Sequence, residues 1–377
     1  MKELGIYIHI PFCIKKCKYC DFTSYANSNH IEKYIQAVLK EIEQGKELNN
    51  YTVTTIYIGG GTPSSVDAKY IGYILNKLKE KFNIKENAEI TIEINPGTVT
   101  EEKLNQYKEY GINRLSIGLQ ETDNNLLKML GRIHTYEEFL NVYNIAREVG
   151  FDNINVDLMI GLPNQDLENI TNSLEKIINL NPKHISVYSL IIEEGTVLCK
   201  EIESGTLNLP NEELEREQYW HVKNTLEKNG YIHYEISNFA KKGFESKHNM
   251  NCWEQKEYIG FGIAAHSYID GIRYSNIENL NTYIDNMFGG KSIDNRVINE
   301  KQESEDVQNE FMLLNLRKLE GVSIQSFKLK FNTNPLFKFK KELNKLVNDE
   351  LILVDGDRIM LTNKGLDLAN LVWEEFV

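Results

Sequence analysis

The sequence has little positive charge, no long apolar run and few cysteines. Its 42 lysines and arginines face 55 aspartates and glutamates, which gives a formal net charge of −13. Nucleic acids and anionic membranes select for basic patches, so this charge predicts no nucleic-acid partner. No apolar stretch approaches the roughly 20 residues that a transmembrane helix needs, and the first expected strand follows almost directly after Met1. We therefore expect a cytoplasmic protein without a transmembrane segment.

Three of the five cysteines, Cys13, Cys17 and Cys20, stand at C-x3-C-x2-C spacing after an apolar run. Such thiols stay available to metal in a reducing compartment. A [4Fe–4S] cluster that only carries electrons takes four thiolates, so three cysteines without a near fourth indicate a cluster with one open iron. Spacing alone leaves two alternatives: a zinc site, which usually shows C-x2-C pairs, and three incidental thiols.

Apolar β-rich runs alternate with amphipathic helical stretches, the pattern of a parallel βα architecture. Six strands are predicted, at Ile6–Ile10, Thr54–Ile58, Glu89–Ile94, Arg114–Ile117, Ile154–Met159 and His184–Leu190. Five helices are predicted between them, at Ile31–Gln44, Ala68–Lys81, Glu101–Tyr110, Tyr136–Val149 and Leu167–Asn179, each with apolar residues at three-to-four spacing. We therefore expect an α/β fold built on a partial (β/α)6 barrel.

The remaining chain predicts further elements and three domains. They are a helix at Asn211–Asn229, a strand at Tyr231–Ile236, tail helices at Glu310–Leu319, Phe327–Lys330 and Leu336–Val347, and a hairpin at Leu351–Leu361. We expect a barrel over residues 1–190, an extension over 191–295 and a small winged-helix-like α+β domain over 296–377. The tail domain would cover the barrel mouth or meet a partner, or it would only stabilise the fold.

Polar motifs fall at the ends of the predicted strands, where parallel barrels gather reactive groups. Gly59–Gly61 would let the backbone approach a ligand closely, or would form only a tight turn. Glu93 and Asp157 end apolar runs, where a carboxylate is costly to bury alone. Each carboxylate is therefore either a helix cap or a group that accepts hydrogen bonds from ligand hydroxyl and ammonium groups.

The segment from Gly5 to Phe22 resembles the signature of radical S-adenosylmethionine (SAM) proteins, in their coproporphyrinogen-oxidase-like branch. The resemblance implies that Cys13, Cys17 and Cys20 hold a [4Fe–4S] cluster and that SAM chelates its open iron. Gly59–Gly61 resembles the GGE-like motif that holds the methionine amino group. The SAM-contacting positions that the resemblance implies are Tyr7, Tyr19, Gly60, Gly61, Thr62, Glu93, Gln120, Arg132 and Asp157.

Two subfamilies of this branch differ at marked positions. Oxygen-independent coproporphyrinogen oxidases carry a fourth cysteine two positions after the third, and a long N-terminal extension, whereas this chain has Phe22 there. It is similar instead to the radical SAM heme chaperones of the HemW type, which end the cluster motif in C-D-F and carry an H-N-x-x-Y-W signature. His248, Asn249 and Trp253 match that signature, and Cys252 stands where it has tyrosine.

The resemblance implies a heme carrier, with heme as a third cofactor. It also implies an acceptor protein, with proteins of the respiratory chain among the candidates, and it leaves undetermined whether the chain forms an oligomer. His248 is the heme-ligand candidate, and Cys252 would share its face on a helix; the alternative is that His248 only hydrogen-bonds in a loop. We assign no catalytic residue and leave SAM cleavage open. The alternative function is a coproporphyrinogen III oxidase that decarboxylates propionate side chains through a 5′-deoxyadenosyl radical. Electron transfer alone would leave the glycine and carboxylate motifs unexplained.

Overall fold

A computed structural model describes residues 1–45, 48–289 and 295–377. Its centre is a curved sheet whose first six strands are parallel and pair in chain order. They are β1 (Lys2–Ile10), β2 (Tyr51–Gly60), β3 (Ile84–Ile94), β4 (Arg114–Gln120), β5 (Asn153–Ile160) and β6 (His184–Ser189). All six predicted strands are confirmed, and the predicted partial barrel is confirmed with them.

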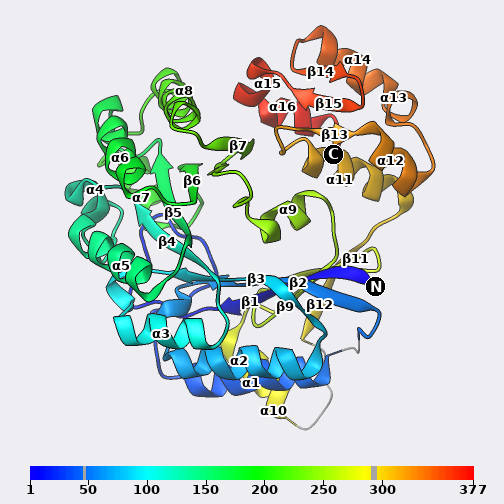
Figure 1. Cartoon of the computed structure of the whole chain (residues 1–377). Helices are drawn as coiled ribbons and strands as arrows, with labels where there is room; N and C mark the ends of the chain where they lie inside the picture. The colour runs from blue at the N-terminus through cyan, green and yellow to red at the C-terminus, as the bar shows by residue number, and fades with distance from the viewer. Residues whose placement is uncertain (46–47, 290–294) are drawn as a thin grey trace.

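Helices cover the outer side of this curve, from α1 and α2 below the sheet to α6 beside it (Figure 1). They are α1 (Ile31–Gln44), α2 (Ala68–Lys81), α3 (Glu101–Glu109), the short α4 (Asn124–Met129), α5 (Tyr136–Val149) and α6 (Leu167–Leu180). Their ends follow local sequence signals: Thr135 and Glu138 form a capping box that starts α5, and Gly150 ends it at φ 94°. The five predicted helices are confirmed.

Short strands extend the sheet at both edges. Beyond β1 lie β9 (Tyr258–Phe261), which is parallel to it, and then the antiparallel β10 (His266–Ile269), β11 (Ile272–Asn276) and β12 (Arg296–Lys301). Beyond β6 lie the antiparallel β8 (Asn238–Ala240) and β7 (Ile232–Glu235), which follow α7 (Val197–Glu203) and α8 (Glu212–Lys228). Only β7 and α8 among these were predicted, because strands this short show too few alternations to be recognised.

The C-terminal part has its own hydrophobic core, formed by side chains between Phe311 and Phe376. It holds a three-stranded antiparallel sheet of β13 (Val322–Ser323), β15 (Arg358–Leu361) and β14 (Ile352–Asp355). The helices around it are α11 (Ser304–Asn315), α12 (Ile324–Phe331), α13 (Pro335–Lys338), α14 (Lys340–Asn348), α15 (Asn363–Asp367) and α16 (Ala369–Glu374), and α10 (Leu280–Phe288) lies against α1 instead. This confirms the predicted small α+β unit, while the three domain boundaries stay predictions.

Two tail helices differ from their predictions. The helix predicted at Glu310–Leu319 begins earlier as α11, because Glu303 and Asp306 form a capping box before it. The helix predicted at Leu336–Val347 is divided, since Phe339 leaves helical geometry at φ −107° and ψ 33° between α13 and α14. Across the three described ranges, no helix has the length and apolar character that crossing a bilayer requires.

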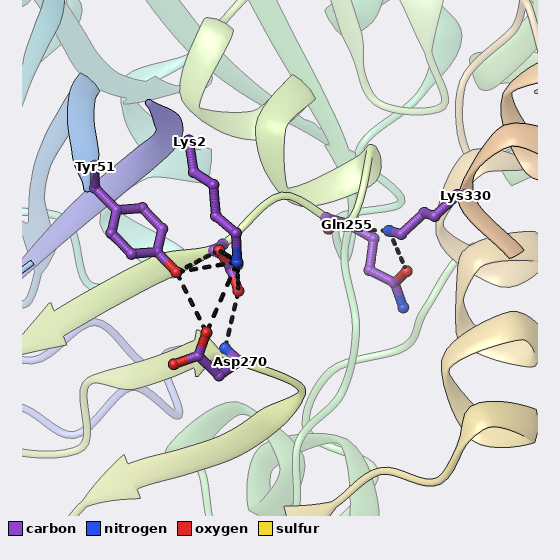
Figure 2. A network of polar contacts seen from close by, with 6 residues as sticks. Lys2, Tyr51, Gln255, Asp270 and Lys330 are labelled. Carbon is purple, nitrogen blue, oxygen red and sulfur yellow. Dashed lines mark hydrogen bonds and ion pairs between the residues drawn. The ribbon is translucent and has the colours of Figure 1, made fainter.

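The C-terminal part lies across the open side of the curved sheet, with α9 (Lys247–Trp253) between the two (Figure 1). Figure 2 shows Lys330 of α12 beside Gln255, whose side-chain oxygen accepts a 2.8 Å hydrogen bond from the lysine Nζ. Arg273 of β11 pairs with Glu310 of α11 at 2.7 Å. These polar contacts join the edge of the sheet to the C-terminal part.

A second network in Figure 2 ties the amino ends of three strands together. The Tyr51 hydroxyl donates to Glu257 at 2.7 Å, and Lys2 pairs with Glu257 at 3.3 Å and with Asp270 at 3.7 Å. Because this network lies at the amino ends of β1 and β2, it stands at the opposite end of the sheet from the predicted site.

Candidate functional site

The parallel strands end around a cavity of about 470 Å³, a volume that suits one ligand of drug-like size. Most of the predicted ligand residues line it: Cys13, Cys17, Tyr19, Cys20, Gly60, Gly61, Thr62, Glu93, Gln120, Arg132 and Asp157. Two predicted residues, Tyr7 and His248, lie outside it. The cavity therefore brings together residues from all six strand ends, as the barrel rule predicts.

The loop that carries the three cysteines follows β1 and is held from two sides. The Cys13 amide donates to the Tyr25 carbonyl at 3.0 Å, and the Tyr25 amide donates back to the Pro11 carbonyl at 2.7 Å. Further along, the Lys18 amide donates to the Leu130 carbonyl at 3.0 Å. Backbone hydrogen bonds thereby hold the loop at both ends of the cysteine motif.

All three cysteines carry free thiols. Burial raises the pKa of Cys20 to about 11 and that of Cys13 above its usual range. A metal would therefore displace protons from these sulfurs on binding. Within the described ranges, no three Cys, His, Asp or Glu side chains converge as ligands of one ion; a [4Fe–4S] cluster takes one thiolate on each iron, so sulfurs spread along a loop suit it.

The glycines after β2 lie where side chains would not fit. A Cβ on Gly60, whose φ is +113°, would lie 2.7 Å from the His9 ring, and one on Gly61 would lie 3.0 Å from Cys13 Sγ. The Thr62 amide donates to the Phe12 carbonyl at 2.8 Å. The glycine loop therefore packs its backbone against the cysteine loop, and both face the same cavity.

Glu93 and Asp157 are not helix caps, so the capping alternative is wrong for both. Glu93 accepts hydrogen bonds from the Tyr57 hydroxyl at 2.8 Å and from the Gly60 amide at 3.3 Å. Asp157 accepts from the Asn155 side-chain amide at 2.7 Å. Burial raises the pKa of Glu93 to about 7 and raises that of Asp157 as well, because desolvation disfavours the charged form.

Arg132 and Gln120 complete the polar lining. The Arg132 guanidinium donates to the Gly118 carbonyl at 2.5 Å and to Cys17 Sγ at 3.5 Å. Its Nε atom is buried and has no hydrogen-bond partner among the described residues, so a bound acceptor would satisfy it. Gln120 ends β4 in the left-handed region at φ +75°, a strained conformation for a residue other than glycine that often marks a functional position.

The two tyrosines of the prediction differ in their placement. Tyr19 lines the cavity, whereas the Tyr7 hydroxyl is hydrogen-bonded to His9 Nδ1 at 3.0 Å. The Tyr7 ring stacks on Tyr57, with centroids 6.4 Å apart. Tyr7 therefore stands behind the wall of the cavity, and its contact with SAM stays a prediction.

His248 is buried in α9 and packs against the inner face of the sheet. Its Nδ1 atom is 3.0 Å from the Thr55 hydroxyl, and its ring stacks on Tyr57 with centroids 5.2 Å apart. Burial lowers the pKa of His248 to about 4, so its imidazole is neutral at pH 7. Trp253, at the end of the same helix, packs under the Arg317 guanidinium at 4.4 Å.

Several residues of the site were assigned no ligand role from the sequence. Tyr57, Ser116 and Tyr188 also line the cavity, and Asn155 holds the carboxylate of Asp157. The signal for Asn155 was present, because polar residues alternate with apolar ones along β5 and so share one face. Nothing in the sequence marks Tyr57, which stands among apolar residues of β2.

Comparison with known families supports the cluster assignment. Residues 7–177 match the Radical SAM superfamily, and residues 303–368 match the HemN C-terminal domain. Membership of this superfamily implies a [4Fe–4S] cluster and SAM, and the observed site fits both. Three thiols share one cavity with a glycine loop that has no room for a Cβ and with Arg132, whose Nε atom has no hydrogen-bond partner among the described residues.

Similar whole proteins include two bacterial heme chaperones. The chain is 37% identical to heme chaperone HemW from Lactococcus lactis subsp. lactis (strain IL1403), covering 100% of this chain and 98% of that protein. It is 38% identical to heme chaperone HemW from Bacillus subtilis (strain 168), covering 98% of each. Among solved structures, coproporphyrinogen III oxidase (HemN) from Escherichia coli shares the fold, with a TM-score of 0.85 at 24% identity over 100% of this chain and 90% of that chain.

Proposed function

This chain belongs to the HemW family of radical SAM proteins, and on that premise we propose that it binds heme and delivers it to an acceptor protein. The observation that carries the proposal is the cavity, in which three thiols face the polar groups predicted to bind SAM. Position 22, where the oxidases have a fourth cysteine, is Phe22 in this chain. The full-length similarity to proteins named heme chaperones supports it.

We assign the cluster to the thiolates of Cys13, Cys17 and Cys20. When bound, the cluster and SAM supply redox chemistry at the open iron. The polar groups of the cavity would hold SAM: the Gly60–Thr62 backbone lies beside the cysteine loop, and Glu93 and Asp157 offer acceptors for its ammonium and hydroxyl groups. Arg132 provides a donor beside Cys17.

The heme ligand is a separate part of the proposal. His248 is the candidate that the signature nominates, and its imidazole is neutral and therefore able to bind iron. It is enclosed between Thr55 and Tyr57, so ligation there would require α9 to move away from the sheet. The acceptor protein, the oligomeric state and the cytoplasmic location stay predictions.

One anaerobic experiment tests the function. The chain is loaded with iron and sulfide, supplied with SAM and hemin, and passed over gel filtration, while coproporphyrinogen III is offered to a parallel sample. We expect retained heme that moves to an added apo-heme protein, and no protoporphyrinogen. The matched control is a variant with Cys13→Ala, Cys17→Ala and Cys20→Ala, which should lose the cluster and release heme without directed transfer.

The outcomes separate the two functions. Formation of protoporphyrinogen would assign the oxidase activity instead, and failure to retain heme in the loaded protein would reject the carrier function. The fold shared with the oxidase does not favour that activity, since one fold hosts different functions.

A further inference from the structure

The rim of the cavity is apolar, in contrast to its polar floor. Phe22 and Ile191 line the cavity and are 63% and 69% exposed. Tyr188 also lines it and is 40% exposed, and Leu190 lies between Tyr188 and Ile191 in the chain. Large apolar side chains gathered at the opening of a site mark a surface that binds an apolar partner.

These rim residues come from two separate segments. Phe22 follows the cysteine motif, and Tyr188, Leu190 and Ile191 belong to the end of β6 and the segment after it. The cysteine loop reaches the chain that follows β6, where the Leu198 amide donates to the Lys18 carbonyl at 2.9 Å, so the two segments border one opening. A flat apolar ligand would span this opening.

Charge on the rim is uneven. Lys15 and Lys16, both exposed, line the cavity from the cysteine loop, in a chain whose net charge is −13. Asp21 and Glu193 line it as well. An anionic group would therefore be accepted where the two lysines stand.

The volume decides where a second ligand can lie. A cavity of about 470 Å³ is matched to one ligand of drug-like size. With SAM on the polar floor, a macrocycle as large as heme would not fit inside and would lie across the opening.

We propose that heme docks flat across this opening, on Phe22, Tyr188 and Ile191, with its propionates toward Lys15 and Lys16. The proposal rests on the heme-carrier function and gives it a binding surface that the chain's heme signature does not include. Heme in this place would cover bound SAM.

The test measures the dissociation constant of hemin for the cluster-loaded, SAM-bound chain. In the double variant Phe22→Ser and Ile191→Ser we expect it to rise at least about tenfold, because each apolar side chain would lose contact area with the macrocycle. Phe337→Ser with Leu329→Ser is the matched control, since both side chains are highly exposed, at 78% and 80%, on the C-terminal part. Iron content and circular dichroism verify that the variants fold and keep the cluster.

Two further measurements locate the heme. Lys15→Glu should weaken hemin binding and leave binding of the heme dimethyl ester, which lacks charged propionates, unchanged. Bound hemin should slow the dissociation of radiolabelled SAM at least about fivefold, since it covers the exit from the cavity.

Each outcome has a definite meaning. Hemin binding that is unchanged in the rim double variant, or that is lost in His248→Ala with SAM release unaffected by hemin, would overturn the rim as the docking surface and leave the carrier function standing. A wild-type chain that retains no hemin would overturn the carrier function itself.

Discussion

The imidazole ring of His248 stacks on the phenol ring of Tyr57, with centroids 5.2 Å apart and planes inclined by 28°. The Tyr57 hydroxyl in turn donates to Glu93 at the floor of the cavity. Tyr57 therefore connects the helix that carries the heme signature to the proposed SAM site. A shift of α9 that moves the Tyr57 ring would therefore change the hydrogen bond that Glu93 accepts from the Tyr57 hydroxyl.

Removal of the Tyr57 hydroxyl should weaken SAM binding. Tyr57→Phe keeps the ring against His248 but leaves one oxygen of Glu93 without its donor. A hydrogen bond to a charged group contributes about 1.5–3 kcal/mol, so we expect a roughly tenfold or greater loss of SAM affinity, measured by calorimetry. Tyr107→Phe is the control, because the buried Tyr107 hydroxyl has no hydrogen-bond partner among the described residues; equal SAM affinity in both variants would contradict the assignment.

SAM affinity should depend on pH near neutrality. Burial raises the pKa of Glu93 to about 7, so this carboxyl is mostly protonated at pH 6 and mostly ionised at pH 8. Because the ionised form accepts hydrogen bonds from an ammonium group, SAM affinity should rise as pH increases through about 7. Glu93→Gln should bind weakly and lose this pH step, and Tyr57→Phe should move the step to higher pH, since the hydroxyl lowers the pKa. A step that persists in Glu93→Gln would assign it to another group.

Substitution at Gly60 should introduce backbone strain and a steric clash. Gly60→Ala places a methyl group 2.7 Å from the His9 ring at a φ of +113°, and we expect a loss of unfolding free energy of about 2–4 kcal/mol with loss of SAM binding. Gly243→Ala is the matched control, because its φ is also positive, at +85°, with nothing within 4 Å among the described residues. That variant should lose only about 1 kcal/mol and keep SAM affinity, as measured by chemical denaturation and calorimetry.

Removal of Arg317 should weaken the attachment of the C-terminal part to α9. Its guanidinium lies 4.4 Å from the Trp253 ring of α9 and 4.9 Å from the Trp373 ring of α16. Each such contact contributes about 0.5–2 kcal/mol, so Arg317→Ala should lower the unfolding free energy by about 2 kcal/mol and speed proteolysis between the sheet and the tail. Arg358→Ala, which removes an exposed pairing at 3.4 Å with Glu320, should change stability by less than about 0.5 kcal/mol.

The candidate site residues that could be found from the sequence are those that lie at the ends of predicted strands. Cys13, Glu93 and Asp157 each follow or end a β-rich run, and parallel strands carry such positions to one edge. Tyr57 was not predicted, because an inward position on a strand is defined by register, and a bulge between Val53 and Thr55 shifts that register. His248 matched a signature, but whether a side chain faces a ligand or a neighbouring strand depends on packing that only the three-dimensional structure shows.

The two-sided attachment of the cysteine loop separates the path of its backbone from the sulfur atoms that it carries. Backbone hydrogen bonds tie Cys13 to Tyr25 and Lys18 to Leu130, and a backbone hydrogen bond does not depend on the side chain of either residue. Exchanging one cysteine for serine should therefore remove a thiolate and leave the course of the loop as it is.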